Sequence, residues 1–278
     1  MSSAPNPTEI AQLARLFERA PLAVLTGAGI STDSGIPDYR GAGTPPRTPM
    51  SIEQFTHDEA YRRRFWAGAR IGSLRAAGVA PNAGHLALAR LEAAGRINGV
   101  ITQNVDNLHR RAGSRTVVEL HGNGNVIRCT AHGHRFTRDQ VLAWFDEQNP
   151  GFAARNADAE IAPDGDALVT ETAAVIEPRC PECGATLRPD VVYFGEFVPQ
   201  PVFAAAADLV AGAGGLLLIG TSLAVNTGIR LVHRAEQREI PFAVINRGPT
   251  AVDARPGLAV RIDGSATEVL EALEQVLS

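Results

Sequence analysis

The sequence predicts an α/β fold, in which a doubly wound parallel sheet carries a small inserted module. Short apolar runs alternate with helical patterns along most of the chain, which is typical of parallel strands joined by right-handed crossovers. Between residues 125 and 194 this pattern breaks, turn-forming residues increase, and all three cysteines occur there. A chain of 278 residues therefore fits one large α/β domain with an insertion.

The elements of the large domain can be placed in order. Residues 8–20 carry apolar side chains at helical spacing, with Thr8 as a candidate N-cap. Further helices are expected over 52–76, 85–94, 201–212, 226–238 and 265–277. Strands are expected over 22–26, 99–103, 115–120, 215–220, 241–246 and 259–262. Gly95 directly follows one of these helices, where glycine is a favourable C′ residue.

Composition and charge restrict the class of protein. The hydrophobic content is 45% and the charged content 20%, which is ordinary for a globular chain. A net charge of −4 without a dense basic run does not support a nucleic-acid partner. No apolar stretch is long enough to span a membrane, and the first residues lack a signal-peptide pattern. With few cysteines as well, we expect a cytoplasmic protein with no membrane partner.

A glycine-rich stretch follows the first expected strand. In Gly27-Ala28-Gly29, missing side chains let backbone N–H groups approach a pyrophosphate at a helix N-terminus. The dehydrogenase fingerprint needs a third glycine where Thr32 stands, and no strand with an acidic end follows about 20 residues later. The long loop from Pro37 to Pro49 is more typical of a functional segment than of a simple connection. The stretch therefore predicts a dinucleotide site without ordinary hydride transfer.

Polar side chains close the next two expected strands. Asn104 and Asp106 suit a carboxamide and a ribose hydroxyl, and they are also good helix N-cap residues. His121 ends the third strand and can take a proton near neutral pH, although an isolated histidine is more often structural. Ligands of open parallel sheets gather at the carboxyl ends of strands, so these residues are candidates for one site.

The cysteines predict a metal site in the insertion. Cys180 and Cys183 have the spacing of a zinc knuckle, which aims two thiolates at one metal. Cys129 precedes two histidines, His132 and His134. His132 keeps the same spacing and is the expected fourth ligand; His134 is the alternative, and a degenerate site without metal is the third interpretation. Zinc accepts a Cys₃His set.

Taken together, these motifs resemble those of the sirtuins, which are NAD-dependent protein-lysine deacylases. The segments 27–31 and 35–40 resemble the family signature, and 103–109 resembles the segment that grips nicotinamide and its ribose. The resemblance covers roughly residues 8–275. It implies a Rossmann-like NAD-binding domain, a zinc-binding module, and a cofactor-binding loop with a small helical lid. The NAD-binding domain would occupy residues 1–124 and 195–278, and the zinc-binding module residues 125–194. The cofactor-binding loop and the lid would occupy residues 41–80.

The resemblance also implies roles for individual residues. His121 would be the general base, with Asn104 and Asp106 as its catalytic partners. NAD contacts are implied for Gly27, Ala28, Gly29, Asp38, Tyr39, Arg40, Gln103, Asn104, Val105, Asp106, Gly220, Thr221, Ser222, Asn246, Arg247, Gly248 and Ala266. Substrate contacts are implied for Val191, Val192, Tyr193, Phe194, Gly195 and Trp66. The zinc ligands would be Cys129, His132, Cys180 and Cys183.

The implied reaction moves an acyl group from lysine to ADP-ribose and releases nicotinamide. The amide oxygen attacks the nicotinamide-bearing ribose carbon, and a ribose hydroxyl activated by His121 then attacks the imidate. Water finally releases free lysine and O-acyl-ADP-ribose. NAD and zinc are the implied cofactors, and acyl-lysine proteins or peptides are the substrates. The alternatives are a mono-ADP-ribosyltransferase, which passes the ribosyl group to protein, and an NAD-sensing module without turnover.

The acyl preference is predicted from one helix. The stretch 64–70 and the loop 162–166 resemble class II sirtuins of the mitochondrial lipoamidase and ADP-ribosyltransferase type. The desuccinylase branch has Tyr-x-x-Arg where this chain has Trp66 and Ala69. Arg70 is one residue out of register and is rotated by about 100° on a helix. We therefore expect an apolar pocket that favours longer or branched acyl groups over succinyl.

Overall fold

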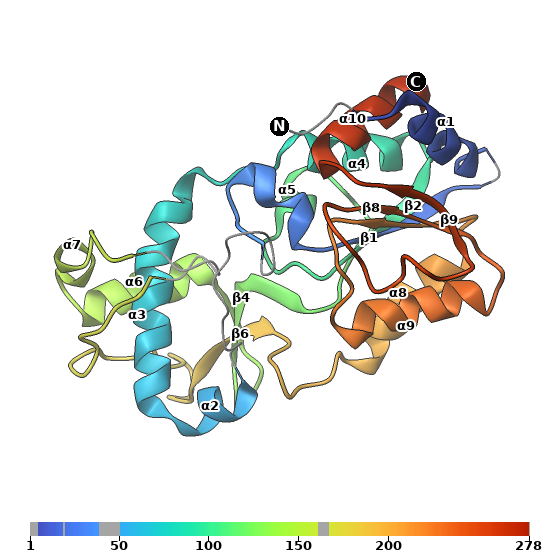
Figure 1. Ribbon diagram of the computed structural model, residues 1–278. Coiled ribbons are helices and arrows are strands. Elements are labelled where there is room, and N and C mark those ends of the chain that lie inside the picture. The colour runs from blue at the N-terminus through green and yellow to red at the C-terminus, as the bar shows by residue number, and fades with distance from the viewer. Residues whose placement is uncertain (1–4, 19, 39–50, 161–166, 278) are drawn as a thin grey trace. The chain divides into compact units, whose positions relative to one another are not determined.

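The chain forms two compact units in the computed structural model, which describes residues 5–18, 20–38, 51–160 and 167–277 (Figure 1). The first unit comprises Met1–Gly35, Ala80–His121 and Val198–Ser278. The second comprises Ile36–Val79 and Gly122–Phe197. The described part of the predicted loop and lid, 51–79, thus belongs to the same unit as the insertion.

A parallel sheet of six strands forms the centre of the first unit. Its strands are β1 Leu22–Thr26, β2 Ile97–Thr102, β3 Val117–Glu119, β7 Leu216–Ile219, β8 Phe242–Ile245 and β9 Leu258–Ile262. Their spatial order is β3-β2-β1-β7-β8-β9, so the winding reverses between β1 and β7. This confirms the predicted doubly wound sheet. Ligands of such sheets bind beside the reversal, outside the carboxyl ends of the strands.

Both faces of this sheet are buried. Alternate residues of β1 enter different cores: Leu22 and Val24 belong to one, and Ala23 and Leu25 to the other. Burial on both faces explains why the strands read as continuous apolar runs in the sequence. Figure 1 shows the covering helices. One face is covered by α1 Pro7–Leu16, α4 Ala83–Ala93 and α10 Ala266–Leu277, and the other by α8 Gln200–Ala211 and α9 Asn226–Glu236.

Two helix boundaries differ from the prediction because a side chain supplies the cap. Asn6 Oδ1 accepts a hydrogen bond from the Thr8 N–H at 3.0 Å, so Asn6 is the N-cap of α1. Asp58 interrupts the helix expected over 52–76, and its carboxylate accepts a backbone N–H of the next turn. The result is two helices and a short 3₁₀ turn: α2 Ile52–His57, α3 Glu59–Arg75 and η3 Ala76–Gly78. Gly95, with φ of 69°, ends α4 as predicted.

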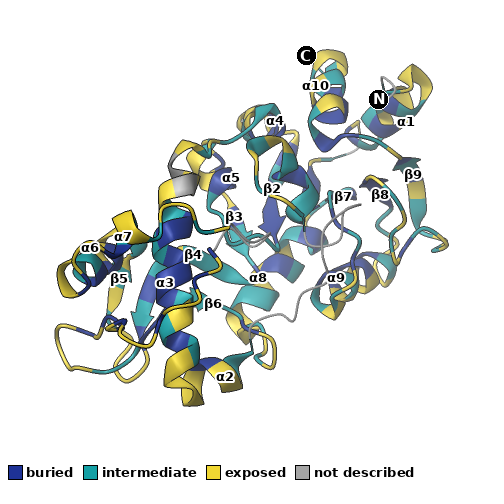
Figure 2. Cartoon of the chain, turned by 60° about the vertical axis from the view of Figure 1, so that its left-hand side comes forward, coloured by how far each residue is buried: buried dark blue, intermediate teal, exposed yellow. Residues whose placement is uncertain are grey.

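The second unit is built on an antiparallel sheet of three strands in the order β5-β4-β6. Its strands and its remaining helices are β4 Gly122–Cys129, β5 Arg135–Thr137, β6 Leu187–Val191, α6 Arg138–Gln148 and α7 Phe152–Arg155. Trp66 of α3 and Phe145 of α6 are the largest fully buried side chains of its core. Figure 2 shows buried residues along α3. No helix among the described residues is long and apolar enough to cross a membrane.

A buried ion pair joins α3 to the chain before β6. Arg62 Nε lies 2.8 Å from Glu177 Oε2, and the two side chains are only 9% and 5% exposed. Arg62 Nη1 also donates to the carbonyls of Phe55 and Thr56, each at 3.1 Å. Arg179 contacts the same carboxylate. The guanidinium of Arg62 is therefore hydrogen-bonded in the interior without water, and its charge is balanced by the Glu177 carboxylate.

We predict that Glu177→Gln lowers the free energy of unfolding by about 3–5 kcal/mol, because it leaves a buried guanidinium without its counter-charge. Urea denaturation measures the change. Glu59→Gln is the matched control, since the Glu59 carboxylate is 54% exposed beside Arg63. The control should cost no more than about 0.5 kcal/mol. Equal effects of the two substitutions would contradict the stabilising role of the buried pair.

Candidate functional site

The sheet of the first unit gathers most of the predicted NAD-contacting residues at one edge. All six strands are parallel, so their carboxyl ends share that edge. Each of these carboxyl ends is followed by predicted residues. In chain order they are Gly27–Gly29 after β1, Gln103–Asp106 after β2, His121 after β3, Gly220–Ser222 after β7, Asn246–Gly248 after β8, and Ala266 at the start of α10. Asp38 belongs to the second unit. Tyr39 and Arg40 lie outside the described residues.

The first glycine turn packs directly against the end of β7. A Cβ atom on Gly27 would lie 2.7 Å from Thr221 Cβ, and one on Gly29 would lie 2.8 Å from Gly220 Cα. The Gly27 and Gly29 N–H groups donate to Ile219 O at 3.0 Å and to Gly220 O at 2.8 Å. These two donors are used within the fold, so a pyrophosphate contact by other backbone N–H groups of the turn stays a prediction. The glycines are required here by backbone packing.

Residues 28–34, directly after the turn, do not form the α-helix whose N-terminus usually completes a pyrophosphate site. They form two 3₁₀ turns, η1 Ala28–Ile30 and η2 Thr32–Ser34. Thr32 replaces the third glycine of the dehydrogenase fingerprint. Its Oγ1 donates to Gly29 O at 3.1 Å and so stabilises this tighter turn. A dinucleotide would therefore meet a short turn and its side chains at this point, instead of the N-terminus of a long helix.

Ser31 connects the ends of β1 and β2. Its Oγ donates to Asp106 Oδ2 at 2.8 Å and accepts from Asn104 Nδ2 at 3.1 Å. Asn104 Nδ2 also donates to Gly27 O at 3.1 Å. The Ser31 side chain is buried, so these bonds do not compete with water. Ser31 belongs to the signature segment 27–31, but no role was predicted for its side chain; the available signal was its place directly after the glycine turn.

The alternative interpretation of Asn104 and Asp106 as N-cap residues is wrong for the cap position itself, because the N-cap of the following helix is Asn107. Asp106 Oδ1 accepts from the Leu108 N–H at 2.9 Å at the start of α5 Leu108–Arg111. The other carboxylate oxygen is bonded to Ser31. The side chain of Asp106 therefore has a local structural role and also belongs to the polar cluster. Val105 lies between Asn104 and Asp106 and, like them, is partly exposed.

His121 is held as a neutral base. Its Nδ1 lies 2.9 Å from Gln103 O. A carbonyl only accepts, so Nδ1 carries the proton and Nε2 keeps its lone pair. Burial lowers the pKa of His121 below its usual 6.5, although the bond to Gln103 acts in the opposite direction. Gln103 Nε2 in turn donates to Thr221 Oγ1 at 2.9 Å, which ties this segment to the end of β7.

The end of β8 forms a tight polar turn. Asn246 Nδ2 donates to the carbonyls of Arg247 and Gly248 at 2.9 and 3.1 Å, and Gly248 has a φ of 77° that favours glycine. The Arg247 side chain is exposed. Ala266 is buried in the core, so only its backbone could meet a ligand.

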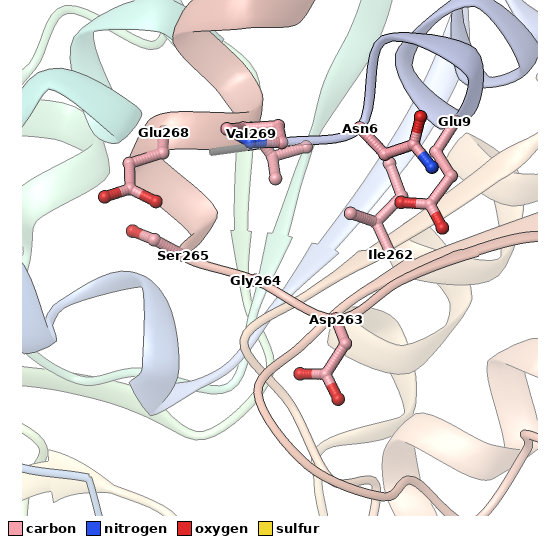
Figure 3. A pocket seen from close by; sticks show the side chains of 9 residues that line it. Asn6, Glu9, Ile262, Asp263, Gly264, Ser265, Glu268 and Val269 are labelled. Carbon is pink, nitrogen blue, oxygen red and sulfur yellow. The ribbon is translucent and has the colours of Figure 1, made fainter. Parts of the chain in front are cut away.

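A small pocket of about 220 Å³ lies where β9 meets α10 (Figure 3). Its lining includes the carboxyl groups of Glu9, Asp263 and Glu268. Three carboxylates disfavour a phosphate group, and the lining contains no residue of the predicted NAD site. We therefore place the candidate site at the strand ends, and not in this pocket.

The predicted substrate residues occupy different environments in the second unit. Val191 ends β6, and Val192 continues beyond the strand. Phe194 is 54% exposed, and its carbonyl accepts from a backbone N–H of α2 at 3.1 Å, just before the turn at Gly195. Tyr193 is buried under the Arg188 guanidinium, which lies 4.4 Å from its ring centroid.

Trp66 is 1% exposed and belongs to the core of the second unit. Its contact with an acyl group, like that of Tyr193, stays a prediction. Ala69 is also buried, while Arg70 Nε lies 2.7 Å from Asp146 Oδ1 in an ion pair. The loop 162–166, on which part of the acyl prediction depends, lies outside the described residues.

Four side chains of the second unit form a candidate metal centre. Cys129, His134, Cys180 and Cys183 offer ligand atoms that all lie within 4.8 Å of one another. All three cysteines are free thiols. His134 Nδ1 lies 3.3 Å from Cys180 Sγ, and its Nε2 lies 3.3 Å from Glu182 Oε2. A carboxylate behind the ligating imidazole is typical of zinc centres, and the Cys₃His donor set fits zinc.

The structure places His134 in this centre, which corrects the expectation for His132. The Cys129 N–H donates to His134 O at 2.8 Å, so residues 130–133 form the turn between β4 and β5. Paired residues of an antiparallel hairpin direct their side chains to one face, which brings His134 beside Cys129. The His132 side chain is exposed on the turn. A hydrogen bond from the backbone of His132 lowers the pKa of the Cys129 thiol to about 7, which favours the metal-binding thiolate.

Comparison with known proteins agrees with this arrangement. The Sir2 family profile matches residues 27–227. NAD-dependent protein deacetylase 1 of Mycobacterium avium (strain 104) is 46% identical over 273 residues, which are 97% of this chain and 96% of that protein. The solved structure "Sir2-p53 peptide-NAD+" has a TM-score of 0.76 at 30% identity, covering 96% of this chain and 98% of its own. The "Structure of Sir2Tm bound to a propionylated peptide" has a TM-score of 0.74 at 30% identity, with coverages of 97% and 99%.

We predict that His134→Ala protein holds less than about half of the zinc of the wild type, because a structural zinc site needs all four ligands. His132→Ala is the matched control on the same turn and should keep the full zinc content. Elemental analysis of the purified proteins measures both. Loss of zinc from the His132 variant alone would restore the ligand set expected from the sequence.

Proposed function

The chain belongs to the Sir2 family, and from this premise we propose that it is an NAD-dependent protein-lysine deacylase. It transfers the acyl group from lysine to ADP-ribose and releases nicotinamide. A relative of nearly equal length and 46% identity is named a deacetylase, which favours this reaction over mono-ADP-ribosyl transfer. The observation that carries the proposal is the neutral, partly buried imidazole of His121 beside Asn104 and Asp106, at the ends of neighbouring strands.

The residues of the first unit have distinct roles in this proposal. NAD supplies the ribose carbon and hydroxyls that receive the acyl group, with nicotinamide as the leaving group. Asn104 and Asp106 orient the carboxamide and the ribose, and Ser31 fixes both side chains through its single hydroxyl. His121 takes a proton at Nε2, since its Nδ1 proton is committed to Gln103 O. The residues after β7 and β8 bind the adenosine half.

The acyl-lysine lies in another polypeptide. The 278 residues contain 26 basic residues of the Lys and Arg type, and every one of them is arginine. This chain therefore has no lysine side chain to present to its own site. The solved structures similar to it include complexes with peptides, one of which is propionylated. We propose acyl-lysine proteins or peptides as the partners; the absence of a nucleic-acid partner and the cytoplasmic location stay predictions.

The acyl group is proposed to be apolar. Arg70 follows Ala69, the position that carries the arginine for acidic acyl chains in the desuccinylase resemblance, and its Nε is paired with Asp146 at 2.7 Å. Binding succinyl through Arg70 would first break this pair. Equal turnover of succinyl and apolar acyl peptides would contradict the preference.

The zinc centre is proposed to be structural. Four protein ligands would close a tetrahedral site and leave no position for substrate. Cys129 and His134 would hold the β4–β5 hairpin, and Cys180 and Cys183 the turn before β6. Zinc would thus fasten two ends of a small sheet whose core is limited.

The decisive experiment is mass spectrometry of the products formed from NAD and a panel of acyl-lysine peptides. The proposal requires deacylated peptide and O-acyl-ADP-ribose in equal amounts. Because the enzyme contains no lysine, every lysine signal belongs to the peptide. Nicotinamide release with covalent labelling of a protein acceptor, and without O-acyl-ADP-ribose, would establish the transferase instead.

We predict that His121→Ala lowers kcat by about 10²–10⁴-fold, because the ribose hydroxyl loses its general base. Binding of NAD, measured by calorimetry, should persist. His57→Ala is the control, since His57 is exposed on α2 in the second unit. A His121→Ala enzyme within tenfold of the wild type would exclude the assigned role.

We also predict the pH dependence of kcat/KM. The base works in its neutral form, so activity is present above the pKa of His121 and is lost as the pH falls through it. Burial holds this pKa below 6.5. More than half of the maximal activity should therefore remain at pH 6.5, with further loss in more acidic buffer. Initial rates between pH 5 and pH 8, at about tenfold sub-saturating substrate, measure the profile. A midpoint above 6.5 would contradict the neutral-imidazole assignment.

A further inference from the structure

A second histidine, His109, lies beneath the site and is used by no step above. It belongs to α5 and is 2% exposed. Its Nε2 lies 2.9 Å from Thr26 Oγ1, which lies 2.9 Å from Thr102 Oγ1. Thr102 Oγ1 also accepts the backbone N–H of Asn104 at 3.1 Å. One chain of hydrogen bonds therefore runs from the imidazole, across the ends of β1 and β2, to the backbone of Asn104.

The direction of this chain follows from the other ring nitrogen. Among the described residues, His109 Nδ1 is buried without a hydrogen-bond partner. An unpaired N–H in the interior is rarer than an unpaired acceptor, so the single proton belongs on Nε2. Burial, aided by the nearby His85, lowers the pKa of His109 to about 3, and a second proton is absent at neutral pH. His109 therefore donates to Thr26, and Thr26 donates to Thr102.

The ring is also prevented from turning. His85 packs beside it with ring centroids 4.8 Å apart. The Nδ1 of His85 lies 3.0 Å from Asn82 Oδ1, whose own side chain caps α4 through the His85 N–H. The His85 ring is thus fixed by the first turn of a helix. The neighbouring ring of His109 is therefore held in one orientation, with its single N–H directed at Thr26 Oγ1.

We propose that His109 is a positioning residue for the deacylation reaction, which sets the spacing between the glycine turn after β1 and the Asn104–Asp106 segment after β2. This inference rests on the proposed function. The backbone contact between the same two strand ends is a bond from the Gln103 N–H to Thr26 O at 3.0 Å. The histidine adds the side-chain connection that fixes the next residue, Asn104. Displacement of such a group by about 1 Å costs up to about 10²-fold in rate.

The rival role of His109 is that of a core filler, and two substitutions separate the roles. His109→Gln places an amide N–H₂ near the position of Nε2 and keeps the donor. His109→Leu keeps apolar bulk and removes the donor. A filler would tolerate leucine at least as well as glutamine, whereas a positioning donor requires the reverse order.

The test measures kcat and KM of the full chain with NAD and an acyl-lysine peptide. We expect His109→Leu to lower kcat by about 10–100-fold with KM for NAD within about threefold, and His109→Gln to remain within about threefold of wild type. Thr26→Val and Thr26→Ser repeat the comparison at the next link, should the leucine variant fail to fold. Wild-type kcat in the leucine and valine variants, or equal losses in glutamine and leucine, would overturn the proposal.

Hydrogen exchange gives a readout that needs no turnover. The Asn104 N–H is held by Thr102 Oγ1, so segment 103–108 should exchange faster in His109→Leu than in His109→Gln. If wild-type protein lacks deacylase activity but shows this exchange difference, the proposed function fails and the hydrogen-bond chain stands. If activity is present and neither exchange nor kcat differs between the variants, the positioning role fails alone.

Discussion

The first unit depends on one close backbone contact between the ends of β1 and β7, where the winding of the sheet reverses. Gly29 N–H donates to Gly220 O at 2.8 Å, and a Cβ on Gly220 would lie 2.4 Å from Ile30 N. Gly220 also has a φ of 59°, which side chains rarely adopt. Only glycine on both sides lets β1 and β7 end so near each other. That closeness allows Gln103, which follows β2, to reach Thr221, which follows β7, and it draws the polar strand ends into one site.

Desolvation then determines the chemistry of this site. Burial lowers the pKa of His85 to about 4 and that of His109 to about 3, and it lowers the pKa of His121 as well. All three imidazoles are therefore neutral at physiological pH, and each has one donor and one acceptor nitrogen. A neutral ring in a low-dielectric interior forms directed hydrogen bonds without the cost of a buried charge. His121 can serve as a base because the fold holds it in this state.

The second unit is stabilised by other means. Its three-stranded sheet is small, and two polar devices supplement its apolar core. The ion pair of Arg62 and Glu177 fastens α3 to the segment before β6, and the Cys₃His cluster gathers two turns on one candidate metal. Both devices join parts of the chain more than 40 residues apart. Neither requires the periodic apolar pattern that organises the first unit, which explains why this region reads as irregular in the sequence.

The sequence by itself determined the doubly wound sheet, the end of α4 at Gly95, and the strand-end positions of Asn104, Asp106 and His121. These features depend on periodicity and on turn residues within a few positions, which a linear reading contains. Tertiary structure alone decided which partners those residues meet. His134 replaces His132 in the metal centre because hairpin pairing, and not spacing, sets which side chains share a face. Ser31 and His109 acquired roles because their partners, Asp106 and Thr26, lie 75 and 83 residues away. Such contacts arise only when the strand ends come together, so no local pattern records them.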